Sequence, residues 1–244
     1  MKQHEAVIKT LEKLGGLATL SELYDNVRKV KNCEWKTKTP NESIRRIVQT
    51  RPKEIYKIKP GLYGLVKLKT EIENKGIITE TSFNKNSNEL KESNHTYYQG
   101  LLLYIGKFRG FDTFAPQQDK NKLFKNNKTI KDLRTLDLIY KFGYDEFVKR
   151  SSTIDVIWFN VKKMPDSFFE VEYSPEFQNS LLKFSDLCDF NTKMIIVSDK
   201  KQKDKFKDKL KITAFSNLKP RIQFWTYEKV VLEYNYAYEL NNLL

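Results

Sequence analysis

The chain has little glycine, cysteine or histidine, and it has no long apolar run. Only 9 of its 244 residues are glycine, which excludes a collagen-like repeat and a Gly/Ser-rich low-complexity chain. No apolar run approaches the ~18 residues that a membrane-spanning helix needs. The first residues, MKQHEAVIKTLEKLGG, lack the apolar segment of a signal peptide. We therefore expect a cytoplasmic protein that does not enter a membrane.

The scarcity of cysteine and histidine argues against several kinds of site. A structural zinc site would need nearly all of Cys33, Cys188, His4 and His95. His95 stands without the Asn/His pattern of an HNH nuclease, so we expect no catalytic base at this position. No Gly-rich phosphate-binding loop is present, so we expect no hydrolysis of a nucleoside triphosphate (NTP).

What the sequence does have is aromatic residues and positive charge. Aromatic residues make up 13% of the chain, and a disordered chain would have few of them, so most of it should fold. Lys and Arg exceed Asp and Glu by 44 to 31, which gives a net charge of +13. This excess predicts a polyanionic partner, with nucleic acid first and an anionic membrane surface second.

Composition divides the sequence into three parts. Residues 1–68 hold 15 basic and 7 acidic residues. Residues 69–94 are rich in Asn, Ser, Glu and Lys and have few large apolar side chains, so we interpret them as a linker. Residues 95–244 form the third part, in which strand-like runs such as STIDVIWF and KMIIVS alternate with helical stretches. This alternation predicts an α/β domain with a mixed sheet.

The first part has the pattern of three short helices followed by a hairpin. EIYKI and LYGLV alternate in polarity around a Pro-Gly turn. Such an order describes a winged helix-turn-helix, whose third helix would place Arg and Gln side chains against base edges in the DNA major groove. The predicted DNA-binding residues are Ser43, Arg45, Arg46 and Gln49 on that helix, with Lys57 and Lys59 in the wing. The alternative is a plain solvated basic face.

Three carboxylates in two apolar strand-like runs are the most informative residues. Asp155 lies in STIDVIWF, and Glu170 and Glu172 lie in FFEVEY. Acidic residues are rare in buried strands because removing a charge from water is costly. Residues i and i+2 of a strand share a face, so Glu170 and Glu172 project together, and a neighbouring strand can bring Asp155 beside them. Such a cluster suits Mg²⁺ or Mn²⁺; the alternative is that the three acids lie on a solvent face.

These residues resemble the core of a known family. Asp155 followed by Glu170-Val171-Glu172 is similar to a PD-(D/E)XK nuclease, in the variant with Glu at the usual Lys position. The resemblance covers roughly residues 96–230. The first part resembles the HARE-HTH type of winged helix through TLSELYDNV, TPNESIRRIV and PGLYGL. Together they imply an α+β multidomain protein, with a winged helix-turn-helix followed by an α/β PD-(D/E)XK core whose mixed sheet is flanked by helices.

The resemblance also implies roles for individual residues. Asp155 and Glu170 would bind Mg²⁺, or Mn²⁺ in its place, through their carboxylates, and the Val171 carbonyl would be a further ligand. Glu172 departs from the family's usual Lys, so the residue that deprotonates the attacking water is open: Glu172 itself could act as base or hold a metal-bound water.

The resemblance also makes two further residues candidates for the site. Lys183, on the helix that follows the strand, is a candidate for the missing Lys. Gln99 matches a frequent polar position near the metal, and a solvated helix residue is its alternative reading.

The implied activity is that of a type II restriction enzyme in a prokaryotic restriction-modification system. It would cut double-stranded DNA at a specific sequence with Mg²⁺, leave 5′-phosphates and act as a homodimer. Three alternatives stay open. The chain could be a modification-dependent endonuclease, a DNA-binding regulator whose nuclease-like domain is inactive, or an RNA-binding protein.

Overall fold

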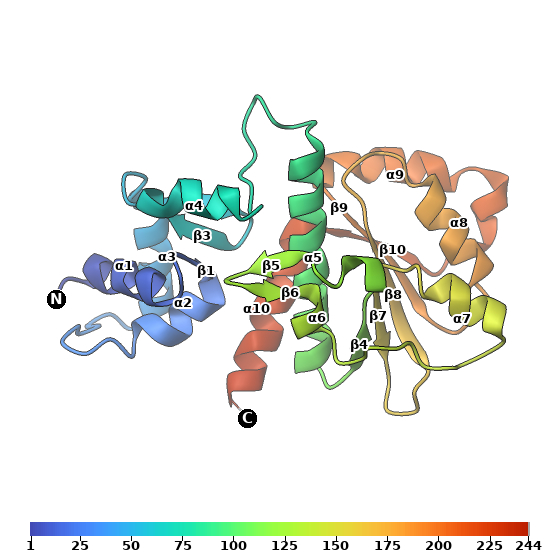
Figure 1. Cartoon of the computed structure of the whole chain (residues 1–244), viewed down its shortest axis with the longest axis horizontal. Coiled ribbons are helices and arrows are strands. Elements are labelled where there is room, and N and C mark those ends of the chain that lie inside the picture. The colour runs from blue at the N-terminus through green and yellow to red at the C-terminus, as the bar shows by residue number, and fades with distance from the viewer. Residues whose placement is uncertain (244) are drawn as a thin grey trace. The chain divides into compact units, whose positions relative to one another are not determined.

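The chain folds into two units, and the computed structural model describes residues 1–243 (Figure 1). The first unit comprises residues 1–93 together with 125–127, and the second begins at residue 94 and holds the rest. No helix among the described residues combines the length and the apolar composition that crossing a membrane requires.

The first unit contains helices and a three-stranded antiparallel sheet of order β1-β3-β2. Its elements are α1 (Gln3–Lys13), β1 (Leu17–Thr19), α2 (Leu20–Val27), α3 (Pro40–Thr50), β2 (Ile55–Lys59), β3 (Leu62–Leu65), the 3-10 helix η1 (Val66–Leu68) and α4 (Lys69–Asn74).

Local sequence explains where these elements begin and end. Thr19 caps α2, since its side chain accepts a hydrogen bond from the Glu22 N–H while the Glu22 carboxylate accepts one from the Thr19 N–H, at 3.3 and 2.8 Å. Pro40 opens α3, as the Thr39-Pro40 pair suggests. Gly61 turns the chain between β2 and β3 with a φ of 76°, a value that glycine adopts without strain.

The segment 69–94 is not the extended linker that its composition suggests. It contains α4 and, up to residue 93, belongs to the first unit. Ile72, Ile77 and Leu90 are buried. Because these three apolar residues lie far apart among polar ones, the composition of the segment conceals its contribution to the core.

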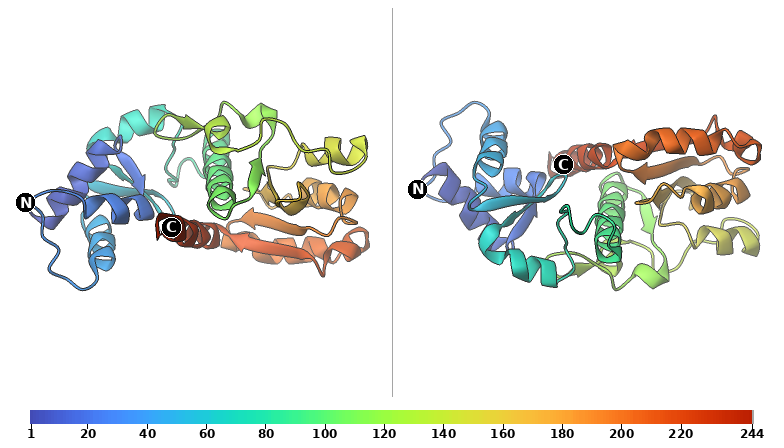
Figure 2. Two further views of the ribbon diagram at one scale, coloured as in Figure 1. Left: turned by 90° about the horizontal axis from the view of Figure 1, so that it is seen from below. Right: turned by 90° about the horizontal axis from the view of Figure 1, so that it is seen from above.

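The second unit is built on a mixed five-stranded sheet of order β10-β9-β8-β7-β4, flanked by helices (Figure 2). β10, β9 and β8 are parallel, and β7 runs antiparallel to both β8 and β4. The strands are β4 (Asp112–Phe114), β7 (Val156–Phe159), β8 (Pro165–Val171), β9 (Lys193–Ser198) and β10 (Ile222–Thr226); β5 (Leu123–Lys125) and β6 (Lys128–Thr129) form a separate pair.

The helices of this unit lie before, between and after the strands. They are α5 (Asn88–Phe108), which begins in the first unit, η2 (Gln117–Asp119), α6 (Ile130–Leu133), α7 (Asp145–Ser151), α8 (Gln178–Asp186), η3 (Lys200–Gln202), α9 (Lys203–Leu210), η4 (Thr213–Leu218) and α10 (Tyr227–Leu243).

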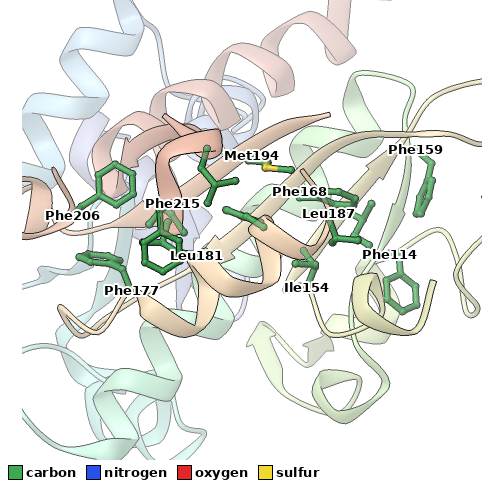
Figure 3. Packing of buried hydrophobic residues seen from close by; sticks show 14 residues of the cluster. Phe114, Ile154, Phe159, Phe168, Phe177, Leu181, Leu187, Met194, Phe206 and Phe215 are labelled. Carbon is green, nitrogen blue, oxygen red and sulfur yellow. The ribbon is translucent and has the colours of Figure 1, made fainter. Parts of the chain in front are cut away.

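Strand alternation sorts the sheet residues onto two faces. One face packs against α8 and α9 in an apolar cluster that includes Phe168, Leu181 and Phe206 (Figure 3). On the other face, the Trp158 indole N–H donates to the Leu102 carbonyl of α5 at 3.0 Å. Glu170 and Glu172 follow Phe168 in steps of two, so they extend the α8 side of the sheet.

Candidate functional site

The three carboxylates predicted to cluster lie at one edge of the sheet of the second unit. Asp155 directly precedes β7, and Glu170 and Glu172 stand at the end of β8. β7 and β8 pair with Val156 opposite Phe169, which brings Asp155 beside Glu170. An Asp155 carboxylate oxygen accepts a hydrogen bond from the Val171 N–H at 2.7 Å. We call Asp155, Glu170 and Glu172 the carboxylate cluster.

Glu170 is held by two side chains of α8. It is only 3% exposed. The Lys183 ammonium lies 2.9 Å from both of its carboxylate oxygens, and the Ser180 hydroxyl donates to one of them at 2.9 Å. Burial and the nearby charge of Asp155 raise the pKa of Glu170 to about 8, even though Lys183 and Ser180 act to lower it.

Glu172 shares the Ser180 hydroxyl with Glu170. Burial is the main reason why the pKa of Glu172 is raised to about 7. The single proton of this hydroxyl serves two carboxylates, and the raised pKa values of Glu170 and Glu172 mean that this pair binds a proton more readily than solvated glutamates do.

Gln99 lies on α5 and is fully buried. Its amide nitrogen donates to the Asp155 backbone carbonyl and to a carboxylate oxygen of Asp119, both at 2.9 Å. Both partners are acceptors, so they fix which end of the amide is nitrogen. Its Oε1 atom is buried without a protein hydrogen-bond partner among the described residues. Gln99 is thus a buried residue beside the cluster rather than a solvated one.

Sequence reasoning missed two residues of this site, His95 and Asp119. The His95 Nε2 atom lies 3.1 Å from an Asp155 carboxylate oxygen. Burial opposes a charge on His95, but the Asp155 carboxylate more than offsets it and raises the pKa of the imidazole. Asp119 pairs with Lys122 at 2.8 Å. The available signal was the spacing of His95 and Gln99, which are four residues apart and so share a helix face.

Asp155 is the anionic member of the cluster. Burial alone would raise its pKa, but His95, Lys183 and the Val171 N–H together lower it. Asp155 therefore stays negatively charged, whereas Glu170 binds a proton more readily.

The donor atoms of the cluster suit a divalent cation chemically. Three carboxylates supply hard oxygen ligands of the type that Mg²⁺ prefers, and the buried Oε1 of Gln99 is a further acceptor beside them. In residues 1–243, however, no three His, Cys, Asp or Glu side chains are arranged as a set of ligands around one point. Instead, Lys183 contacts the Glu170 carboxylate, and His95 and the Val171 N–H contact that of Asp155.

In the first unit, the predicted DNA-binding residues of α3 lie opposite its buried side. Ile44 and Val48 are buried, whereas Arg45, Arg46 and Gln49 are exposed and Ser43 is half-buried. This arrangement leaves one polar, basic face of the helix open to solvent.

The two wing lysines differ. Lys57 is exposed, but Lys59 is only 4% exposed and its ammonium donates to the Ile78 carbonyl at 3.1 Å. Burial lowers the pKa of Lys59 to about 7. Lys59 is therefore not part of the exposed basic surface, because its side chain turns towards Ile78 in the segment that follows α4.

Comparison with curated proteins and with solved structures gave no match to this chain. A family model does match. Residues 77–240, about two thirds of the chain, match the model described as type II restriction enzyme NmeDI C-terminal domain. The matched residues include the whole carboxylate cluster together with His95, Gln99, Asp119 and Lys183.

Proposed function

The chain belongs to the family of the type II restriction enzyme NmeDI C-terminal domain, and we propose that it is a sequence-specific endonuclease that hydrolyses double-stranded DNA. One observation carries the proposal: within the matched residues, Asp155 just before β7, Glu170 of β8 and Glu172 just after β8 meet at one sheet edge. Removing a carboxylate from water is costly, and Glu170 is buried while Asp155 and Glu172 are half-buried, so their convergence calls for a chemical role.

We propose that Asp155, Glu170 and the Val171 carbonyl hold Mg²⁺, for which Mn²⁺ can substitute, in the arrangement of a PD-(D/E)XK nuclease. Bound there, such an ion supplies charge neutralisation at the phosphate and lowers the pKa of a coordinated water. Lys183 and His95, which neutralise the same carboxylates here, would have to release them.

Side chains of the site and one backbone N–H would orient the carboxylates and activate the water. Ser180 and Lys183 orient the Glu170 carboxylate from α8, and the Val171 N–H orients that of Asp155. Glu172 is the proposed base for the attacking water, because it is half-buried whereas Glu170 is buried. Lys183 is the alternative, since its ammonium already lies at the cluster. Attack of water on the phosphorus would break the bond from phosphorus to the 3′ oxygen, which leaves as a 3′-hydroxyl, and the phosphate would remain as a 5′-phosphate.

We propose that the first unit is a winged helix-turn-helix that binds the DNA. Helices α1, α2 and α3 come before the β2–β3 hairpin, which forms a three-stranded antiparallel sheet with β1. Arg45, Arg46 and Gln49 would read base edges in the major groove, with Ser43 at the start of the same face. Lys57 would contact phosphate from the wing.

We also propose a homodimer, because one carboxylate cluster per chain cuts one strand, and a double-strand break needs two. Sequential nicking by a monomer is the alternative. Titration of cleavage rate against protein concentration separates the two, since a dimer gives a rate that rises with the square of concentration below its dissociation constant.

The experiment that tests the function is incubation of the purified chain with a long unmodified duplex and Mg²⁺, followed by sequencing of the ends. Discrete ends with 5′-phosphates at one recurring sequence support the proposal. The same reaction on a methylated duplex identifies a modification-dependent enzyme. Absence of new ends with both Mg²⁺ and Mn²⁺ would refute the endonuclease.

A second function, a DNA-binding regulator with an inactive nuclease-like unit, is favoured by one observation. Each of the three carboxylates has at least one oxygen engaged by a protein donor, and Glu172 stands at the position of the usual Lys. A regulator of this kind would bind duplex DNA in a salt-sensitive way without cutting it. Duplex binding and cleavage measured on the same preparation of protein test this.

A further inference from the structure

A lysine-rich segment, residues 200–211, begins close to the carboxylate cluster. β8 and β9 are parallel and in register, with Val171 opposite Val197, and the Glu172 N–H donates to the Val197 carbonyl at 2.8 Å. β9 ends one residue later, and η3 begins at Lys200. Neighbouring strands are ~4.8 Å apart and an extended residue spans ~3.3 Å, so η3 starts within roughly 10 Å of the Glu172 backbone.

The lysines of this segment fall into two groups. Those at the far end of the segment are neutralised: Lys207 lies 3.7 Å from Asp204, and Lys211, just after α9, lies 2.7 Å from Asp208. Lys200 and Lys201, which we call the η3 lysines, are exposed, and no ion pair is found for either in residues 1–243. Lys203 and Lys205 are exposed as well, so the unneutralised charge covers the first part of the segment, and the η3 lysines are its members nearest the cluster.

The turn that presents the η3 lysines is fixed by a local hydrogen bond. An Asp199 carboxylate oxygen accepts from the Lys201 backbone N–H at 2.7 Å, which caps η3 directly after the strand. The position of the lysine backbone relative to the sheet edge is thus set by β9 and this cap, although the side chains themselves remain free in solvent.

A polyanion that approaches this edge meets two opposing fields. The carboxylate cluster repels phosphate, whereas cations within a Debye length, ~10 Å at 0.1 M salt, attract it. Lys183 and His95 are already engaged with the cluster, so they add little attraction at a distance. The η3 lysines are exposed, unpaired charges at the same edge.

We propose that Lys200 and Lys201 form a contact surface for the phosphate backbone of the DNA that flanks the bond to be cut. This inference rests on the proposed function, because it takes duplex DNA as the substrate of the cluster. It assigns to the second unit a binding surface of its own, separate from the α3 face of the first unit.

The test is the salt dependence of duplex binding by the full chain, in EDTA so that nothing is cut. The affinity of wild type, Lys200→Gln/Lys201→Gln and Lys207→Gln/Lys211→Gln for a labelled duplex is measured across a range of KCl concentrations. Each lost phosphate contact lowers the slope of log affinity against log salt by about 0.9. We expect the first variant to lose about 1.8 from the slope, and the second variant to keep the wild-type slope.

The two double variants remove the same charge from neighbouring positions, so a general charge effect would change both slopes equally and overturn the proposal. Equal slopes for all three proteins, or no duplex binding by wild type, would overturn it as well. Cleavage with Mg²⁺ is scored separately. If wild type cuts DNA but the η3 variant keeps the wild-type slope, the endonuclease proposal stands and the η3 contact surface is excluded. If the slopes change as expected but wild type never cuts, the contact surface stands and the endonuclease proposal is excluded.

Discussion

Lys183 spans from α8 to the sheet edge and places its ammonium 2.9 Å from both carboxylate oxygens of Glu170. The same ammonium donates to the Thr153 carbonyl at 2.8 Å. Lys183 therefore joins α8, β8 and the segment before β7 at one point. Glu170 is buried, so the pair is shielded from solvent in a way that surface ion pairs are not.

Replacing Lys183 with Met should lower the free energy of unfolding by about 2 kcal/mol. Breaking a buried ion pair usually costs about 3–5 kcal/mol, but Glu170 has a pKa of about 8 and is already largely protonated at pH 7, so less charge is left unpaired and the loss is smaller. Urea unfolding at pH 7 measures the effect, and the same preparation should show reduced cleavage.

The matched control for this prediction is Lys193→Met. Lys193 pairs with Asp166 at 3.3 Å, but its side chain is exposed, and surface pairs contribute about 0–1 kcal/mol. Equal losses in the two variants would show that the Lys183–Glu170 contact has no special role in stability.

Asp155→Asn should reduce cleavage at least ~100-fold while it leaves duplex binding in place. Asparagine keeps the shape and the oxygen that accepts from the Val171 N–H, but it removes the negative charge proposed to hold Mg²⁺. Single-turnover cleavage and duplex binding in EDTA measure the two effects. Asp166→Asn is the control, because Asp166 lies on β8 away from the cluster. Normal cutting by Asp155→Asn would disprove the site.

The central part of this site could be predicted because its signal is local. Asp155, Glu170 and Glu172 are acids inside short apolar runs, and the two-residue period of a strand places both glutamates on one face. The mixed sheet was also predictable, since strand-like and helical runs alternate along residues 95–244. Lys183 could be proposed only through the resemblance.

His95 and Asp119 could not be found in the same way. His95 contacts Asp155 from 60 residues away in the sequence, and Asp119 is joined to the site through Gln99. The four-residue spacing of His95 and Gln99 places them on one helix face, but it does not mark His95 as buried or paired, and Asp119 has no such signal. Such contacts depend on how α5 and η2 pack on the sheet, which no local pattern records.

The β5–β6 hairpin was missed for a different reason. Its strands are three and two residues long, too short to show an alternating pattern. The signal was the turn itself, since Asn126 and Asn127 both have positive φ, a conformation that asparagine tolerates better than most residues.

Arg45→Ala and Arg46→Ala should weaken binding to the target sequence more than binding to a scrambled duplex. A good base contact contributes about 1–3 kcal/mol of discrimination, whereas a phosphate contact such as that proposed for Lys57 weakens all sequences alike. Competition binding with both duplexes measures the ratio. Lys29→Gln is a control in the same unit, because Lys29 pairs with Asp25 at 2.8 Å. An unchanged ratio in both Arg variants would exclude base reading by α3.

Lys59 should make the stability of the first unit depend on pH. Its pKa in the folded chain is about 7 because burial disfavours the charged form, while the unfolded value is close to 10.5. Between these values the unfolded chain binds more protons, so the free energy of unfolding rises with pH, by at most ~1.4 kcal/mol for each pH unit. Below pH 7 both forms are protonated and the full cost of burying the charge is present.

Lys59→Met removes this dependence, because the methionine side chain fills a similar volume without a charge. We expect the variant to be more stable than wild type at pH 6.5, with the advantage shrinking as the pH is raised to 8.5. Glu170 and Glu172 contribute with the opposite sign over part of this range, since their raised pKa values mean that the folded chain releases their protons late. Subtracting variant from wild type at each pH cancels their contribution. The exposed Lys57→Met variant should show no such trend, and a constant difference between Lys59→Met and wild type across the range would show that Lys59 stays charged when folded.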